Sequence, residues 1–378
     1  MENRKEYRLG EMIACNPQVK LEKGKQYNLV DIDSIEIGSR YVAGKELTTY
    51  EGQSGCHFQN GDTVMARITP CLENGKIAQV QCESEKGFGS TELFVFRGID
   101  NKTDTDYVFN LMSMQFIRNL AANSMTGASG RQRADLGFIK RIKWNFPPLP
   151  IQRRIASILS TYDALIQNYK RQIAALQSAA SELYKEWFVR FRFPGYKNAK
   201  FDNGLPEGWK VERVKNCVNR LPFGQTYKKD ELESKGKVIV IDQSEDEYLG
   251  FHNYEPSHKA SAENPIALFG DHSCKYQLMI KNFSLGENII PYTAKNVDLY
   301  YLYFAVYKIV QTEEYKRHWS LFVNKKILIP NNDLQMKFRF FIIPLFKKIE
   351  MIKQQITNLT TQRDLLLPRL MSGKLSVE

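Results

Sequence analysis

A short glycine-rich stretch of the chain ends in side chains that suit the reading of DNA bases. Arg131, Gln132 and Arg133 follow the small residues Gly127–Gly130. Arginine can donate two hydrogen bonds to guanine, and glutamine can exchange two hydrogen bonds with adenine. Neighbouring glycines allow a backbone to approach a duplex closely. Contact with DNA is one interpretation of these three side chains, and a solvated surface loop is the other.

Further polar side chains suit contact with bases or phosphates. Arg67 and Thr91 lie on predicted strands, where a purely structural role is the alternative. Gln225, Lys228 and Lys229 gather in one short stretch, and the two lysines are predicted to position phosphates rather than read bases. A polar loop after a later predicted strand adds Asp271, His272, Ser273, Lys275 and Tyr276 to the DNA-binding candidates.

The same sequence gives no strong case for catalysis or metal binding. Asn145–Pro148 departs from the Asn-Pro-Pro-aromatic motif of amino-methyltransferases. His272 and Cys274 are too few to hold a metal ion. Glu233 and Lys235 have the spacing found in many nucleases, but no aspartate precedes them in a matching context. We expect a binding subunit without a catalytic residue, metal or cofactor of its own, and a nuclease with an unrecognised site remains an alternative.

Composition favours a polyanionic partner in a reducing compartment. The chain of 378 residues carries 53 lysines and arginines against 42 aspartates and glutamates, a formal net charge of +11. Such an excess of positive charge is typical of proteins that bind nucleic acid. The 6 cysteines form no Cys-x-x-Cys pair, which favours free thiols. The first residues are too charged for a signal peptide, so a cytoplasmic location is predicted.

A long helix is predicted to position the first group of candidates. Apolar or aromatic residues recur there at alternating steps of four and three, which is the 3.5-residue period of a coiled-coil seam. Neither glycine nor proline interrupts the run after Pro150. The seam residues are Ile155, Leu159, Tyr162, Ile166, Tyr169, Ile173, Leu176, Ala180, Leu183 and Trp187.

A second helix with the same pattern follows the second group of candidates. Its seam starts at Phe338, 183 residues after Ile155, and keeps the same steps without a gap. Arg363 is its polar interruption, which suits a role in fixing register. Pro344 is predicted to kink this helix or delay its start. The second seam comprises Phe338, Ile342, Leu345, Ile349, Ile352, Ile356, Leu359, Arg363, Leu366 and Leu370.

The order of elements indicates an α/β (α+β) chain with a two-fold internal repeat. We expect an α/β domain at 1–148, a long helix at 149–194, a linker with a second α/β domain at 195–330, and a second long helix at 331–378. In the first domain, strands at 62–68 and 76–81 are expected to form a hairpin, and 107–120 a single helix. The stretch 299–316 is expected to be helical in the second domain.

Several motifs resemble the specificity subunit of type I restriction-modification systems. The chain carries this resemblance over nearly its whole length, most specifically in the helix and linker motifs. The motifs are Gly61–Ile68, Gly89–Arg97, Gly130–Arg133, Phe146–Ala156, Leu183–Gly195, Leu205–Trp209, Phe269–His272 and Leu367–Leu375.

The resemblance implies two target recognition domains and an antiparallel coiled coil of the two long helices. Each domain would read one half of a bipartite site in double-stranded DNA, and the helices would set the spacer. It also implies partners: two methyltransferase subunits that use S-adenosylmethionine, and restriction subunits that use ATP and Mg²⁺. Tyr184, Phe188 and Phe191 are predicted to dock a methyltransferase subunit, with packing against the domain as the alternative. A coiled-coil scaffold that joins two protein-binding domains is the competing functional hypothesis.

Overall fold

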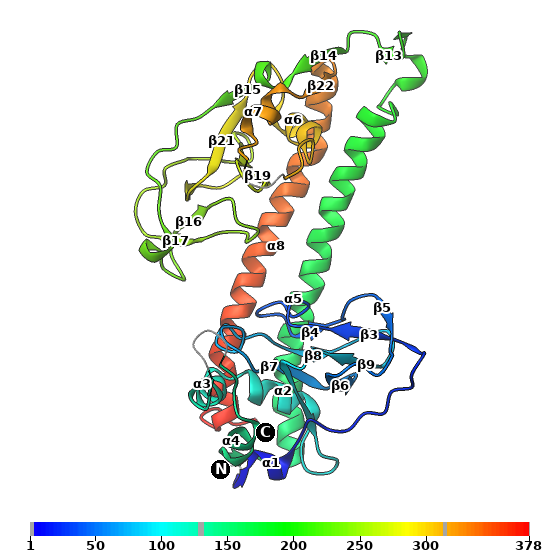
Figure 1. Ribbon diagram of the computed structural model, residues 1–378. Coiled ribbons are helices and arrows are strands. Elements are labelled where there is room, and N and C mark those ends of the chain that lie inside the picture. Colours follow the sequence, from blue (N-terminus) through cyan, green and yellow to red (C-terminus); the bar gives the residue numbers. More distant parts are fainter. Residues whose placement is uncertain (1–3, 128–131, 313–315, 378) are drawn as a thin grey trace. The chain divides into compact units, whose positions relative to one another are not determined.

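The structure is a computed structural model that describes residues 4–127, 132–312 and 316–377 (Figure 1). The chain divides into two compact units. Unit 1 comprises residues 1–168 and 356–378, and unit 2 comprises residues 169–355. This division runs through both long helices, whereas the sequence suggested four consecutive segments. Within the described ranges, no helix is both long and apolar enough to cross a membrane.

Two mixed sheets form the globular part of unit 1. The larger sheet has the strand order β2-β10-β7-β8-β4, and the smaller has the order β5-β3-β9-β6. The predicted hairpin is present, because β7 and β8 pair antiparallel with Thr63 opposite Gln79. The strands are β2 (Ile13–Cys15), β3 (Gln26–Val30), β4 (Tyr41–Val42), β5 (Leu47–Thr49), β6 (Cys56–Gln59), β7 (Thr63–Ala66), β8 (Ile77–Val80), β9 (Lys86–Gly89) and β10 (Leu93–Gly98).

Short helices and an edge pair of strands complete the globular part of unit 1. The edge pair is β1 (Lys5–Arg8) with β11 (Lys143–Phe146), which run antiparallel. α1 (Leu9–Met12) follows β1, and α4 (Leu136–Arg141) precedes β11. Their apolar side chains join the β10 and α2 side chains in one core cluster.

The single helix predicted at 107–120 is instead two helices. α2 (Thr105–Ser113) and α3 (Gln115–Asn123) are separated at Met114, whose backbone is extended with φ −60° and ψ 132°. Met114 buries its side chain in the core. Burial of an apolar side chain therefore fixes a bend that the helical spacing of the flanking residues did not indicate.

Unit 2 repeats the arrangement of sheets with fewer strands. Its sheets have the orders β15-β21-β18-β19 and β17-β16-β20. Val238–Ile241 reads Val-Ile-Val-Ile, a β-branched run that favours a strand, and it forms β16. The other strands are β15 (Val218–Arg220), β17 (Gly250–His252), β18 (Ile266–Gly270), β19 (Tyr276–Met279), β20 (Phe283–Leu285) and β21 (Ile289–Ala294).

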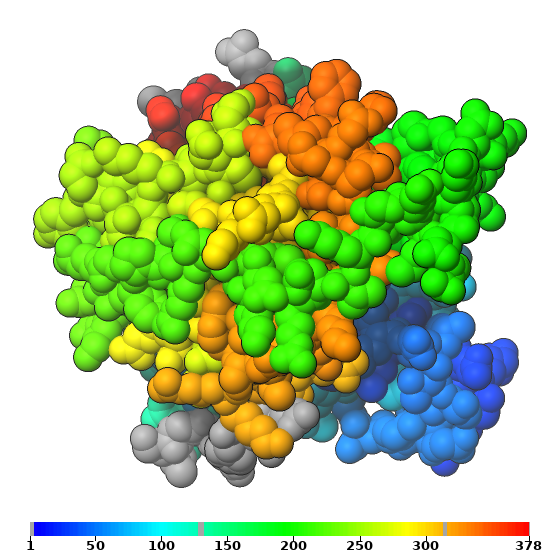
Figure 2. All heavy atoms as spheres, turned by 90° about the horizontal axis from the view of Figure 1, so that it is seen from above, coloured from blue at the N-terminus to red at the C-terminus, as the bar shows by residue number. Residues whose placement is uncertain are grey.

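Unit 2 also has an edge pair that precedes its long helix. β14 (Lys210–Arg213) pairs antiparallel with β22 (Lys326–Ile329), and Figure 2 shows green and orange residues of this unit side by side on one face. The small hairpin of β12 (Phe201–Asp202) and β13 (Leu205–Pro206) comes before it. Single turns of 3-10 helix lie at Tyr196–Asn198, Val214–Asn216 and Lys229–Glu231.

The helix predicted at 299–316 is shorter than expected. α6 (Leu299–Val306) ends at Tyr307, whose backbone is extended, and Lys308 has a positive φ of 56°. A left-handed residue cannot continue a right-handed helix. α7 (Trp319–Asn324) then forms a separate short helix before β22.

The two predicted long helices are present. α5 spans Leu149–Tyr184 and continues as a π-helical turn, η1, at Lys185–Val189. α8 spans Asn332–Ser372, so the late start expected at Pro344 is wrong. Pro344 lies on the exposed face of α8. There, water can satisfy the carbonyl group that loses its N–H partner to the proline.

Within each unit, one segment of α5 packs against one segment of α8. In unit 1 the start of α5 shares a core cluster with the end of α8, through Ile155, Leu159 and Leu370. In unit 2 the end of α5 meets the start of α8, where the rings of Trp187 and Phe338 are 6.0 Å apart. The helix segments are antiparallel in both units, and the seam residues are buried or half-buried.

A matching hydrogen-bonded clasp ties each long helix to the globular part of its unit. Oε1 of Gln152 accepts from the N–H of Asp104 at 3.0 Å, and Oε1 of Gln335 accepts from the N–H of Asp298 at 2.8 Å. Each glutamine also donates to the carbonyl five residues earlier, at 2.9 and 2.8 Å. Both aspartates cap the following helix, α2 or α6. The predicted internal repeat therefore extends to individual hydrogen bonds.

Candidate nucleic-acid interface

Three segments of unit 1 bring the described DNA-binding candidates together. Arg67 directly follows β7, Thr91 lies two residues before β10, and Gln132 and Arg133 precede α4. The N–H of Arg67 donates to the carbonyl of Glu92 at 2.9 Å, which fixes the first two segments side by side. Arg131 lies outside the described residues.

Backbone hydrogen bonds hold the Gln132 segment against the end of β7. The N–H of Thr69 donates to the carbonyl of Gln132 at 3.0 Å, and the N–H of Gln132 donates to Oγ1 of Thr69 at 3.1 Å. The N–H of Ala134 also donates to the carbonyl of Arg67. These bonds use backbone atoms of Gln132, so its side-chain amide keeps its donors and acceptor for another partner.

Arg133 has an acidic partner within this surface. Its Nε and Nη2 donate to both carboxylate oxygens of Glu92, with the Nε contacts at 2.9 and 3.0 Å. Hydrogen bonding to Arg133 lowers the pKa of Glu92, and the carboxylate raises the pKa of Arg133. The pair is half-exposed, so it orients the guanidinium more than it stabilises the fold.

A hollow of about 470 Å³ lies in front of Arg67 and Thr91. The guanidinium of Arg67 lies over the ring of Phe94, 5.0 Å from its centroid. Within the part of the chain that the structure describes, the buried Nε of Arg67 has no hydrogen-bond partner. Other side chains on the wall include Lys20 and His57. Apolar side chains such as Val95 share the wall with the cationic groups of Arg67 and Lys20, whose donors suit the acceptor atoms of guanine or phosphate.

Unit 2 has a hollow of about 350 Å³ at the equivalent place in its sheet. β10 lies between β2 and β7 in unit 1, and β21 lies between β15 and β18 in unit 2. The N–H of Asp271 donates to the carbonyl of Asn288 at 2.9 Å, as that of Arg67 does to Glu92. The segment before α7 then bonds to Asp271, as the segment before α4 bonds to Arg67.

The wall of the second hollow has a mixed charge. Arg220, Arg317 and Glu287 line it together with Phe223 and other residues. The guanidinium of Arg220 lies over the ring of Phe223, 5.1 Å from its centroid. Our sequence interpretation missed Arg220, Glu287 and Arg317. The repeat was the available signal, because Arg317 precedes α7 in the way that Arg133 precedes α4.

Asp271 has a structural task in unit 2. Its Oδ1 accepts from the N–H groups of His318 and Trp319, at 3.1 and 2.9 Å, where α7 begins. The residue is buried, and Oδ2 lies 3.9 Å from Nε of Arg317. The carboxylate therefore holds the segment that carries Arg317.

The other polar-loop candidates of unit 2 bond mainly to their own surroundings. Nζ of Lys275 donates to the carbonyls of Asp242 and Asp246. Nδ1 of His272 contacts the carbonyl of Lys316 at 3.1 Å, Oγ of Ser273 accepts from the N–H of Lys275, and the hydroxyl of Tyr276 accepts from the N–H of Val310.

Gln225, Lys228 and Lys229 lie on an exposed segment of unit 2. The segment leads into the 3-10 turn at Lys229–Glu231, and the N–H of Lys228 donates to Oε2 of Glu231 at 2.7 Å. Exposed lysines remain suited to phosphate contact. They stay predictions of phosphate-positioning residues.

The predicted docking surface needs a correction. Phe188 is 2% exposed and packs in the core of unit 2, where its ring centroid lies 4.7 Å from that of Tyr301. Tyr184 is half-buried beside Phe304, and Phe191 contacts Trp209. The prediction that Phe188 offers an exposed docking side chain is wrong, because the turn η1 directs it into the core.

No metal centre is evident among residues 4–127, 132–312 and 316–377. There, no group of three or more histidine, cysteine, aspartate or glutamate side chains is arranged to hold a metal ion.

The repeated sheets, clasps and hollows define an internally duplicated α/β chain in which each globular part precedes a long helix. Residues 1–178 match the family model of the type I restriction modification DNA specificity domain. The resemblance predicted from the motifs is therefore confirmed.

Named relatives match over part of their length. The chain is 28% identical over 279 residues to the type I restriction enzyme MjaIX specificity subunit of Methanocaldococcus jannaschii, which covers 64% of this chain and 62% of that subunit. It is 28% identical over 180 residues to the EcoEI specificity subunit of Escherichia coli, covering 46% of this chain and 30% of that subunit. The chain thus spans less than two thirds of either relative.

A solved structure shares the fold of the chain. The type I restriction-modification S subunit from M. genitalium aligns with a TM-score of 0.54 over 98% of this chain and 96% of that one. The two sequences are 16% identical. The predicted fold class is confirmed by this likeness.

Proposed function

We propose that this chain is the DNA-specificity subunit of a type I restriction-modification complex. The match of residues 1–178 to the specificity-domain family carries the proposal. The two equivalent hollows give a physical basis for reading a bipartite site, because each repeat would contact one half-site. The net charge of +11 supports binding to a phosphate backbone.

The proposal assigns catalysis to other subunits. Two methyltransferase subunits, one for each repeat, would bring S-adenosylmethionine and methylate adenine. Restriction subunits would bring the ATP- and Mg²⁺-dependent activity. A two-fold repeat within one chain favours two copies of a partner, since equivalent surfaces bind equivalent proteins. The cytoplasmic location stays a prediction.

Co-expression with a methyltransferase subunit gene from the same genome tests the proposal. The purified complex is expected to bind one duplex sequence in large excess over random DNA, and methylated adenines in the host genome are expected to fall in one bipartite motif. Mass measurement of the complex should give two methyltransferase subunits for each copy of this chain. A soluble chain that ignores both the methyltransferase and DNA would favour the protein scaffold instead.

A further inference from the structure

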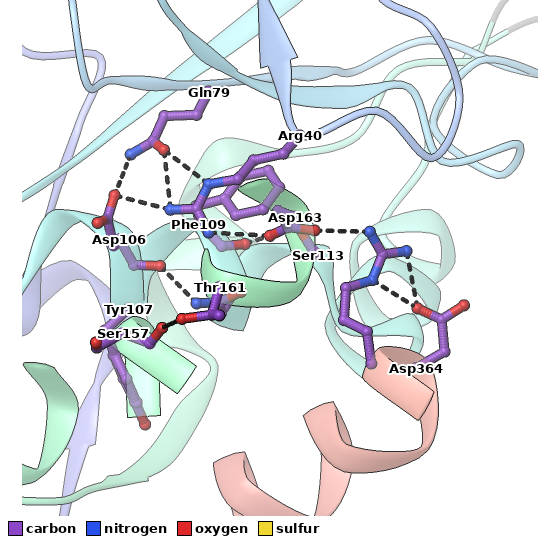
Figure 3. Close-up of polar contacts among 12 residues, drawn as sticks. Arg40, Gln79, Asp106, Tyr107, Phe109, Ser113, Ser157, Thr161, Asp163 and Asp364 are labelled. Carbon is purple, nitrogen blue, oxygen red and sulfur yellow. Dashed lines mark hydrogen bonds and ion pairs between the residues drawn. The ribbon is translucent and has the colours of Figure 1, made fainter. Parts of the chain in front are cut away.

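A buried arginine connects the sheet of unit 1 to α5. The side chain of Arg40, just before β4, is 1% exposed. Its Nε and Nη2 donate to Oε1 of Gln79 on β8, at 3.2 and 3.1 Å, and Nη2 contacts Asp106 on α2 at 2.9 Å (Figure 3). Its Nη1 donates to Oδ2 of Asp163 on α5 at 3.0 Å. The ring of Phe109 packs on the guanidinium at 4.9 Å.

Asp163 extends this cluster to the second long helix. Its other oxygen, Oδ1, accepts from Nη1 of Arg363 on α8 at 2.8 Å, and Arg363 also binds Asp364 (Figure 3). Asp163 is 3% exposed, so both of its oxygens are used inside the protein. One carboxylate thus joins the globular part of unit 1 to both helices. Arg363 is the residue that interrupts the apolar seam.

In unit 2, the positions equivalent to Asp163 and Arg363 carry no charge. Asp163 corresponds to Phe346 after the 183-residue offset, and Arg363 corresponds to Ala180. In unit 2, Ala180 is buried and Phe346 packs on the rings of Tyr300 and Tyr303. Apolar packing at this position is therefore compatible with the fold, and the charged cluster needs a different explanation from stability.

Buried ion clusters favour one geometry more than they favour folding. Desolvation offsets most of the attraction between buried charges, so apolar replacements of similar volume are often neutral for stability. A side chain with fixed hydrogen-bond directions excludes rotated or shifted arrangements, which apolar side chains tolerate. The planar fork of Arg40 imposes such directions on Gln79, Asp106 and Asp163 together.

We infer that Asp163 is a positioning residue. Through Arg40 and Arg363, it holds the first recognition domain, which is the globular part of unit 1, in one position and orientation on α5 and α8, here called a single seating. The effect on DNA rests on the proposed function: a domain with one seating meets its half-site at one distance and rotation. The spacer tolerated by the complex would then depend on Asp163 although this residue is buried away from solvent.

The double variant Asp163→Leu/Arg363→Leu tests the inference in the full chain bound to its methyltransferase subunits. Arg40 keeps Asp106 and Gln79, so no buried charge is stranded. We expect an unfolding midpoint close to that of the wild type. The preference for the correct spacer over one a base pair longer or shorter should fall about tenfold, the factor that corresponds to about 1.4 kcal/mol. An unchanged spacer preference in the folded variant would overturn the inference.

A second readout does not depend on DNA. Spin labels are attached through azide-bearing residues at the exposed positions Lys86 on β9 and Ala164 on α5, so that the native cysteines remain. The wild type should give one narrow distance distribution and the double variant a broad one. Equal widths would refute the single seating. A narrow wild-type distribution without any site-specific DNA binding would instead refute only the proposed function.

Two further variants separate positioning from general damage. Phe346→Leu changes the equivalent apolar position in unit 2 and should leave the unit 1 distance distribution unchanged. Arg363→Lys keeps the charge, but a single ammonium cannot reproduce the fork to Asp163 and Asp364. Arg363→Lys should broaden the unit 1 distance distribution, but less than the double variant does. This variant provides the test if the double variant fails to fold. A wild-type distribution in a folded Arg363→Lys variant would then overturn the inference.

Discussion

The guanidinium of Arg133 can read guanine, yet it has a carboxylate partner within its own surface. Nε and Nη2 of Arg133 donate to Glu92. Guanine could therefore be bound by Nη1, and by Nε and Nη2 once DNA displaces the carboxylate. The phosphate field of a duplex also repels Glu92. The ion pair can thus orient the arginine before binding and disfavour contact with bases that offer no acceptor.

Arg133→Ala should therefore weaken binding to the cognate site by about 1–3 kcal/mol, and it should reduce the discrimination between bases at one half-site only. Changing Lys228 and Lys229 to alanine should weaken binding to all sequences and reduce the salt slope by about one for each phosphate that the variant no longer neutralises. Titrations of the complex with cognate and random duplexes at several salt concentrations measure both effects. Arg171→Ala, on the exposed face of α5, is the surface control. Equal reductions in affinity for cognate and random DNA in both sets would refute this division of tasks.

His252 makes the stability of unit 2 sensitive to acid. It is buried, its Nδ1 accepts from the N–H of Tyr254 at 3.1 Å, and its Nε2 lies 2.8 Å from Oγ of Ser284. Burial lowers the pKa of His252 below its ordinary value of 6.5. Between the folded-state pKa and about 6.5, His252 is protonated in the unfolded chain but neutral in the folded chain. The free energy of unfolding therefore falls as the pH drops below about 6.5.

His252→Gln should remove one proton from this linkage. Between pH 6.5 and the lower folded-state pKa, the variant should lose about 1.4 kcal/mol less stability per pH unit than the wild type. Urea denaturation at a series of pH values, followed through the fluorescence of unit 2 tryptophans, gives the slopes. His258, whose pKa is also lowered by burial, accounts for part of the remaining slope. Parallel pH profiles for wild type and variant would contradict the role of His252.

The elements of this fold differ in how far their sequence specifies them. α5 and α8 carry a 3.5-residue apolar period over many turns, so their presence and seams could be predicted from spacing. The break at Met114 could not, because the flanking residues keep helical spacing and only the core shows why the chain bends. The end of α6 depends on a left-handed residue at Lys308 rather than on a glycine, which removed the usual signal.

The glutamine clasps are the clearest features that spacing alone did not reveal. Gln152 and Gln335 are polar residues in the first turn of an otherwise apolar-patterned helix, 183 residues apart. The repeat could have identified them as equivalent, but their partners, Asp104 and Asp298, come from loops whose positions only the fold defines. The same limit applies to the interface, where Arg67, Thr91 and Arg133 become neighbours through strand pairing.

Gln152→Leu should destabilise unit 1. The leucine leaves the N–H of Asp104 and the carbonyl of Pro147 without their partner, and an unsatisfied buried polar group costs about 1–3 kcal/mol. Gln335→Leu should destabilise unit 2 by a similar amount.

Gln167→Leu is the matched control for the clasp. This half-buried glutamine of α5 donates to a hydroxyl group, that of Ser39 at 3.2 Å, rather than to the backbone. A hydroxyl can rotate toward another partner, so its replacement should cost less than that of Gln152. Urea denaturation measures all three variants, and an equal destabilisation by Gln167→Leu and Gln152→Leu would contradict the clasp.

At the scale of the whole molecule, duplication is the property that the sequence revealed best. The seams keep one offset through both helices, and the clasps and hollows follow it. What the sequence left open is how the repeats differ. Unit 1 uses charge at the Asp163 position and unit 2 uses aromatic packing, and the hollow of unit 1 is more basic than that of unit 2. The difference in charge between the two hollows arises at strand ends and in connecting segments without a periodic pattern, and under the proposed function it affects which bases each repeat reads.

The long helices are expected to set the spacer between the two half-sites. The unit boundary crosses α5 after Asn168 and α8 after Gln355, so residues added at these two points leave the contacts inside each unit intact. A copy of Tyr169–Ala175 inserted after Asn168, and a copy of Ile349–Gln355 inserted after Gln355, adds one heptad to each helix. The seams then remain continuous, and each helix grows by about 10 Å.

The spacer in the recognised site should grow by about one to three base pairs, while both half-site sequences stay the same. Ten ångströms equals the rise of about three base pairs, and bending of the DNA can absorb part of the change. Mapping methylated adenines in cells that carry the double insertion gives the new motif. The insertion in α5 alone is the control, since it mismatches the two helices and should abolish methylation. Full methylation of the original motif by the double insertion would show that another part of the complex sets the spacer.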